Sequence, residues 1–115
     1  PGFRLRAVEL LAQNPTDPTV KDALISALLN DDNAGVRLYA LQGLKEFNSD
    51  DDVRRALIYT LENESNAGIR VEAIEALMPL THDESIGEII QAATREDENA
   101  YVRMKALQFV GSGNQ

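Results

Sequence analysis

Four arginines recur at one constant spacing, and a guanidinium group can bind either phosphate or carboxylate through two parallel hydrogen bonds. They are Arg4, Arg37, Arg70 and Arg103, which follow one another at equal intervals along the chain. An acid stands six positions before each of the last three; these acids are Asp31, Glu64 and Asp97. The net charge of −8 repels phosphate backbones and argues against nucleic-acid binding. We therefore interpret the arginines as structural, suited to fixing the register of a repeat.

The residue types that enzymes use are sparse. His82 is the single histidine, and with Asp83 and Glu84 in the segment THDES it makes a weak, open metal site at best. A Ser–His–acid triad would also need His82. The chain has no cysteine, which excludes disulfides, thiolate metal sites and a cysteine nucleophile. We predict a non-catalytic protein with no cofactor and no metal.

The arginines lie in a phrase that the chain repeats. It reads NAGVRLYAL from Asn33, NAGIRVEAI from Asn66 and NAYVRMKAL from Asn99, and the opening PGFRLRAVE fits the same phrase. Apolar residues recur at i, i+2, i+4, i+5 and i+8, and most of these share one helix face. Each asparagine stands where its side chain can accept a hydrogen bond from the first turn of a helix.

A second segment repeats with the same period. It reads TVKDALISALLN, then DVRRALIYTLEN, then SIGEIIQAATRE, with apolar residues at i, i+3, i+4, i+7 and i+8. Asp17, Asp50 and Asp83 precede these segments as helix caps. Each unit therefore reads as a helix, a turn and a second helix.

Stacked helix pairs bury apolar faces that one pair cannot bury alone, so the pattern predicts an all-α solenoid. We count about three and a half repeats in one domain, residues 1–115. The repeat units are about 1–32, 33–65, 66–98 and a partial 99–115. Because the first residue is proline rather than methionine, we expect this domain to be a fragment of a longer protein.

The acid six places before an arginine, the apolar residue just before it and the alanine and leucine after it resemble the HEAT repeat. The short period is similar to bacterial HEAT repeats of the phycobilisome-lyase type. The NAGVR phrasing also resembles HEAT modules of bacterial proteins that carry an anti-sigma-type zinc finger. The resemblance implies a right-handed α-α superhelix in which Asp31, Glu64 and Asp97 pair with arginines of their own or a neighbouring unit. It also implies that the second helices line a concave surface where partners bind.

Exposed residues of the second helices are the candidates for binding a protein partner. They are Arg54, Arg55, Tyr59 and Arg95, of two residue types enriched at binding hot spots. Tyr59 stands where the other units have serine and alanine, which suggests a contact; lying flat over its own helix is the alternative. Asp22, Arg55 and Glu88 also recur with the period of the repeat and with alternating charge, so we expect a line of ion pairs.

The two ends of the stack lack a neighbouring helix, and natural solenoids cover such ends with polar repeats. We expect uncovered apolar surface at the ends, and hence weak self-association, from Phe3, Val8, Leu107, Phe109 and Val110. No stretch approaches the roughly 18 apolar residues of a membrane span. We therefore expect no direct membrane contact from this segment and favour the cytoplasm.

The function that these features favour is a protein-binding scaffold inside a larger bacterial protein. Two alternatives stay open. One is lyase-like or chaperone-like handling of a tetrapyrrole, which a visible absorbance band would favour. The other is a structural spacer in an anti-sigma-type regulatory protein, which predicts that no mutation of the concave face matters.

Overall fold

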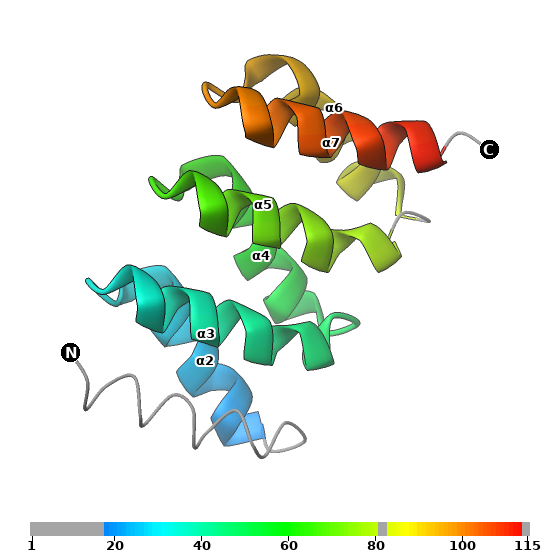
Figure 1. The fold of residues 1–115 in the computed structure, drawn as a ribbon. Helices are drawn as coiled ribbons and strands as arrows, with labels where there is room; N and C mark the ends of the chain where they lie inside the picture. The colour runs from blue at the N-terminus through cyan, green and yellow to red at the C-terminus, as the bar shows by residue number, and fades with distance from the viewer. Residues whose placement is uncertain (1–17, 81–82, 114–115) are drawn as a thin grey trace.

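The described part of the chain folds into helices (Figure 1). The computed structural model describes residues 18–80 and 83–113. The elements are α2 (Pro18–Asn30), α3 (Ala34–Leu44), the 3-10 turn η1 (Lys45–Phe47), α4 (Asp51–Asn63), α5 (Ala67–Leu77), the 3-10 turn η2 (Met78–Leu80), α6 (Glu84–Glu96) and α7 (Ala100–Gly113). The expectations for the opening helix, for Asp17 and for His82 lie outside the described residues.

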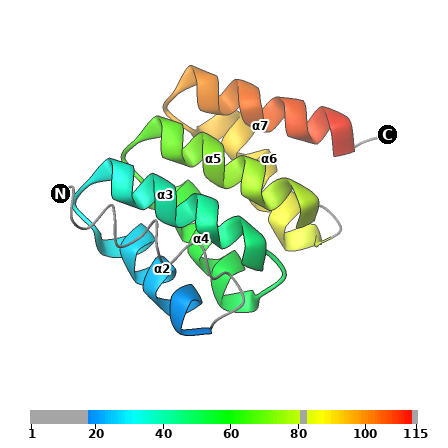
Figure 2. The same cartoon turned by 60° about the horizontal axis from the view of Figure 1, so that its bottom comes forward.

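The helices form two layers, as the two views of the ribbon show (Figures 1 and 2). The first helices of the units, α3, α5 and α7, lie side by side in one layer, and the second helices, α2, α4 and α6, form the other. Each second helix packs against the first helix that follows it, and α3 with α5 and α5 with α7 join successive units. The first helices begin at Ala34, Ala67 and Ala100, at equal intervals along the chain. This is the all-α helical repeat that the sequence predicts.

Polar caps start the helices where the repeated phrases place them. Asn33 Oδ1 accepts a hydrogen bond from the Gly35 N–H at 2.8 Å, which satisfies a donor that the first turn leaves open. The caps that act in the same way on α4, α5, α6 and α7 are Asp50, Asn66, Asp83 and Asn99. The residue at which each helix starts can therefore be identified from the local sequence.

The core lies between the two layers. Its fully buried side chains come from both, among them Leu24, Leu41, Leu57, Ile74 and Ile90. On α7, Met104 and Leu107 are 47% and 60% exposed, as expected for Leu107. The expectation was wrong for Phe109, which is 5% exposed because its side chain joins the core cluster.

Candidate binding surface

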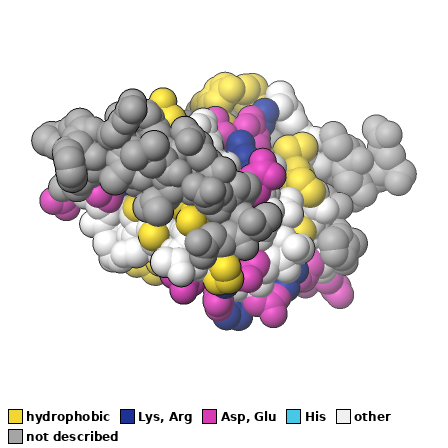
Figure 3. Space-filling model, turned by 90° about the horizontal axis from the view of Figure 1, so that it is seen from below, with side chains coloured by type: hydrophobic (Ala, Val, Ile, Leu, Met, Phe, Trp, Pro, Cys, Tyr) yellow, Lys and Arg dark blue, Asp and Glu magenta, His cyan; other side chains and the backbone are white. Residues whose placement is uncertain are grey.

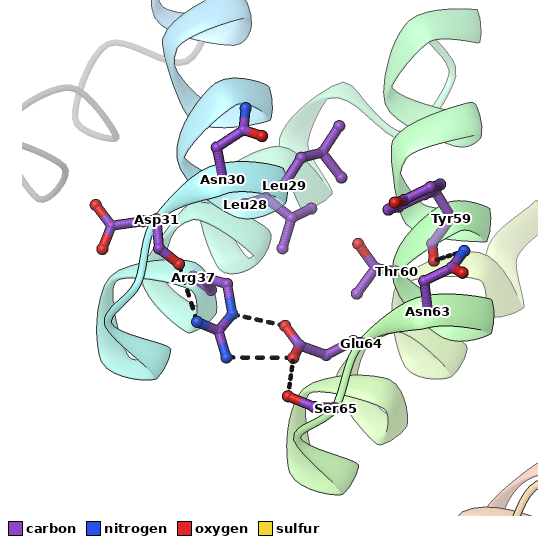
Figure 4. Close-up of a pocket in the computed structure, with 10 residues that line it drawn as sticks. All are labelled: Leu28, Leu29, Asn30, Asp31, Arg37, Tyr59, Thr60, Asn63, Glu64 and Ser65. Atoms are coloured by element: carbon purple, nitrogen blue, oxygen red, sulfur yellow. Dashed lines mark hydrogen bonds and ion pairs between the residues drawn. The ribbon is translucent and has the colours of Figure 1, made fainter.

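Arg37 joins two successive units at the start of α3 (Figure 4). Its Nε and Nη2 donate to the two carboxylate oxygens of Glu64, at 2.7 and 3.2 Å. Its Nη1 donates to the backbone carbonyls of Asp31 and Asp32, at 2.9 and 3.2 Å. One guanidinium group thus ties the turn before α3 to the turn before α5.

Arg70 repeats this arrangement one unit later. Its Nε and Nη2 each donate to one oxygen of Asp97 at 2.9 Å, and its Nη1 donates to the Glu64 carbonyl at 2.7 Å. Such two-pronged pairs are strong and directional. In this arginine–acid ladder (Arg37 with Glu64, Arg70 with Asp97), each arginine bonds the acid of the next unit. Arg103 Nη1 donates to the Asp97 carbonyl at 2.7 Å; Arg4 lies outside the described residues.

The acids also shape the turn between two units. Asp31, Glu64 and Asp97 each accept a hydrogen bond from the backbone N–H two residues on, at 2.8, 3.0 and 2.9 Å. Burial by itself raises the pKa of Glu64, but the hydrogen bonds from Arg37 and from the backbone outweigh it and hold that pKa below its ordinary value. The ionised carboxylate therefore stabilises both its own turn and the contact with the preceding unit.

The exposed side of α2, α4 and α6 is here called the second-helix face. On it, a groove of about 430 Å³ lies between α2 and α4. Its lining residues are Asp22, Ile25, Leu29, Asp52, Arg55, Ala56 and Tyr59. The groove brings together two predicted site residues, Arg55 and Tyr59, and Tyr59 is 55% exposed. Arg54 and Arg95 do not line it: Arg54 pairs with Asp51 of its own helix, and Arg95 is exposed near the end of α6.

The charge pattern on α4 differs from the expected one. Arg55 pairs with Asp52 of its own helix, so the expected line of ion pairs through Asp22, Arg55 and Glu88 is wrong. Asp52 lies one turn away on the same helix, so Arg55 reaches its carboxylate without extending across a groove. This explains why Arg55 pairs with Asp52. Asp22 and Arg55 still line the same groove, as their register requires. In the end-on view of Figure 3, basic side chains likewise lie beside acidic ones on the surface.

A second groove of about 450 Å³ lies between α4 and α6. Its lining residues are Leu61, Glu62, Glu88, Ile89, Ala92, Ala93, Glu96 and Asp97, with no lysine or arginine among them. Asp97 is bound to Arg70, whereas Glu62, Glu88 and Glu96 are exposed and form no ion pair within residues 18–80 and 83–113. This α4–α6 groove was not predicted, because the binding residues expected from the sequence were arginines and a tyrosine.

A link between α2 and α4 was also missed. Lys21 Nζ donates to Asp50 Oδ2 at 3.1 Å, and this hydrogen bond lowers the pKa of the Asp50 carboxyl. The same separation along the chain recurs between Arg54 and Asp83. The Ser85 hydroxyl is the main cause of the lowered pKa of Asp83, and Arg54 contributes. This repeated separation between a cation and a capping aspartate was the signal in the sequence that could have predicted the link between α2 and α4.

The described part of the chain contains neither a cluster of metal-ligating side chains nor a helix that could cross a membrane. Within residues 18–80 and 83–113, no three histidine, aspartate or glutamate side chains cluster in a way that could hold a metal ion. No helix of the same residues combines the length and the apolar character needed to cross a membrane. The arrangement offers helix faces and grooves, which suit the binding of another macromolecule.

Comparison with known families agrees with this architecture. A family model described as HEAT repeats matches residues 1–78, more than half of the 115 residues. No curated protein and no solved structure matches the chain. Beyond the match, α6 and α7 repeat the arrangement of α4 and α5, and Asp97 repeats the role of Glu64. The chain belongs to the HEAT repeat family.

Proposed function

We propose that this chain is a non-catalytic scaffold that binds a protein partner on the second-helix face. HEAT repeats commonly mediate protein–protein interactions, and the family is generally non-enzymatic. The observation that carries the proposal is the pair of grooves on either side of α4, with Tyr59 exposed beside the first of them. An exposed tyrosine offers a large contact area at a low cost in conformational entropy.

The arginine–acid ladder supports this proposal through rigidity. Its hydrogen bonds join each turn to the next, so the helices that carry the grooves are held in one register. A surface that is ordered before binding loses less conformational entropy when a partner docks.

The three tyrosines of the chain allow a matched test. Tyr59 lies on the second-helix face, whereas Tyr39 on α3 and Tyr101 on α7 belong to the layer of first helices and are 41% and 58% exposed. A photo-crosslinking residue in place of each, introduced in source cells, should yield a protein adduct from position 59. Positions 39 and 101 serve as controls.

Tyr59→Ala combined with Arg55→Glu should abolish retention of that same protein in a pull-down, and Tyr39→Ala should not. Adducts from positions 39 and 101 alone would contradict the proposed face. Retention that no variant of the second-helix face changes would favour the spacer alternative.

A further inference from the structure

We propose that the α4–α6 groove receives a segment of the partner protein in which lysine or arginine flanks a large aliphatic side chain. This inference rests on the proposed function and names the chemistry of its partner. Two independent features carry it: the apolar floor of the groove and the uncompensated charge at its rim.

The floor of the groove is apolar and open. Leu61 of α4 and Ile89, Ala92 and Ala93 of α6 form it. Ala92 occupies the position that Tyr59 holds one unit earlier, so a methyl group stands where the neighbouring groove has an aromatic ring. The backbone of α4 also contacts α2 more closely than it contacts α6. A leucine or isoleucine side chain of a partner therefore finds room and apolar contacts there.

The rim of the groove is negative and unneutralised. Glu62 stands on α4, and Glu88 and Glu96 stand on α6, two turns apart. Among the described residues none of the three has an ion-pair partner. The cations Lys21, Arg54 and Arg55 of α2 and α4 are engaged with acids of this chain, and Arg95 of α6 does not line the groove. The charge that complements this rim is that of a lysine or arginine supplied by the partner.

Synthetic peptides of one length separate the two features. A fluorescent amphipathic peptide with lysines around a stripe of leucines is the test ligand, and fluorescence anisotropy with the whole chain measures its binding. One control peptide replaces lysine by glutamate, and a second replaces leucine by glycine. The lysine–leucine peptide should bind at least about tenfold more tightly than either control, because it alone satisfies both floor and rim.

Variants of the chain locate the site. Glu62→Gln, Glu88→Gln and Glu96→Gln together should weaken binding by about fivefold or more, since each exposed pair contributes little alone. Ala92→Arg, which places a cation in the groove, should weaken it similarly. The matched control removes three exposed acids elsewhere, by Asp32→Asn, Glu46→Gln and Glu84→Gln, and should change binding less than about twofold. Circular dichroism verifies that each variant keeps its helices.

Several outcomes would overturn the inference. Equal weakening in the control variant means that net charge alone attracts the peptide. Equal binding of the glycine peptide means that the apolar floor has no part, and equal binding of the glutamate peptide means that the rim has none. If no peptide binds while position 59 still crosslinks a partner, this inference fails and the proposed function stands.

Discussion

Arg70 and Asp97 lie nearly buried against each other, with side chains only 6% and 8% exposed, and two hydrogen bonds of 2.9 Å join them. Arg103 holds the same position one unit later. It keeps only the bond to the Asp97 carbonyl, with no carboxylate on its other nitrogens among the described residues. One repeated phrase thus produces a buried ion pair in one place and a singly bonded arginine in another.

The first prediction concerns this difference. Arg70→Ala leaves the Asp97 carboxylate buried without its cation and should lower the free energy of unfolding by about 3–5 kcal/mol. Arg103→Ala removes one hydrogen bond to a carbonyl and should cost about 1 kcal/mol. Urea unfolding followed by circular dichroism measures both values. Equal losses in the two variants would show that the carboxylate of Asp97 gains nothing from Arg70.

If Arg70→Ala does not fold, Arg70→Lys serves in its place. Lysine keeps the charge but cannot bond both carboxylate oxygens in the plane that arginine uses. We expect a larger loss of stability than that of Arg103→Ala. A fully stable Arg70→Lys protein would argue that charge, and not the two-pronged geometry, holds the units together.

The second prediction is a dependence of stability on pH that runs through Glu64. Its pKa in the folded chain lies below the ordinary value of 4.5, because the hydrogen bonds from Arg37 and the backbone outweigh the opposing effect of burial. A lowered folded pKa adds stability above the unfolded pKa, and this stability is lost as the pH falls through the folded pKa. The urea concentration at the midpoint of unfolding should therefore decrease as the pH is lowered below about 4.5.

The variant Glu64→Gln isolates that contribution from those of the other acids. At pH 7 its urea midpoint should be lower than that of the natural chain. Between pH 5 and pH 3 its urea midpoint should fall less than that of the natural chain. Glu46→Gln, which removes an exposed acid, is the control for the loss of one charge. Identical pH profiles for Glu64→Gln and the natural chain would exclude this role of Glu64.

Much of the fold follows from local patterns. The asparagine and aspartate caps and the helix-period apolar positions are visible in a single unit, and the constant interval between units is visible along the chain, so the helices and their order were predictable. The spacing also placed Arg55 and Tyr59 on one face. In a helix, residues three or four positions apart lie on the same face, so the face that a residue occupies can be predicted from its position in the sequence.

The choice of ion-pair partners was less predictable. Arg55 has Asp52 on its own helix as well as acids at the same register of neighbouring units, and position alone does not decide among them. Phe109 is another example: at the end of the stack it could face outward or inward, and it turns into the core. The α4–α6 groove depends on the distance between helices of two different units, and this distance cannot be predicted from the sequence of one unit.

The third prediction concerns the missed link between Lys21 and Asp50. Their atoms Nζ and Oδ2 lie 3.1 Å apart, and Asp50 also caps α4. Asp50→Ala should lower the free energy of unfolding by about 1–2 kcal/mol, mostly through the lost cap. Lys21→Ala should cost less than Asp50→Ala, because an exposed ion pair contributes little. A double-mutant cycle should give a small favourable coupling energy that falls with added salt; a coupling of zero would show that the pair adds nothing.

The fourth prediction compares one register position in two units. Ile74 on α5 is fully buried, whereas Leu107, which holds the same position one unit later on α7, is 60% exposed. Ile74→Ala creates a cavity between the layers and should lower the free energy of unfolding by about 2–5 kcal/mol. Leu107→Ala should change it by less than about 0.5 kcal/mol, because little of its surface is removed from water on folding. Urea unfolding at several protein concentrations measures both variants; a large, concentration-dependent loss for Leu107→Ala would instead place that side chain in a contact between copies of the chain.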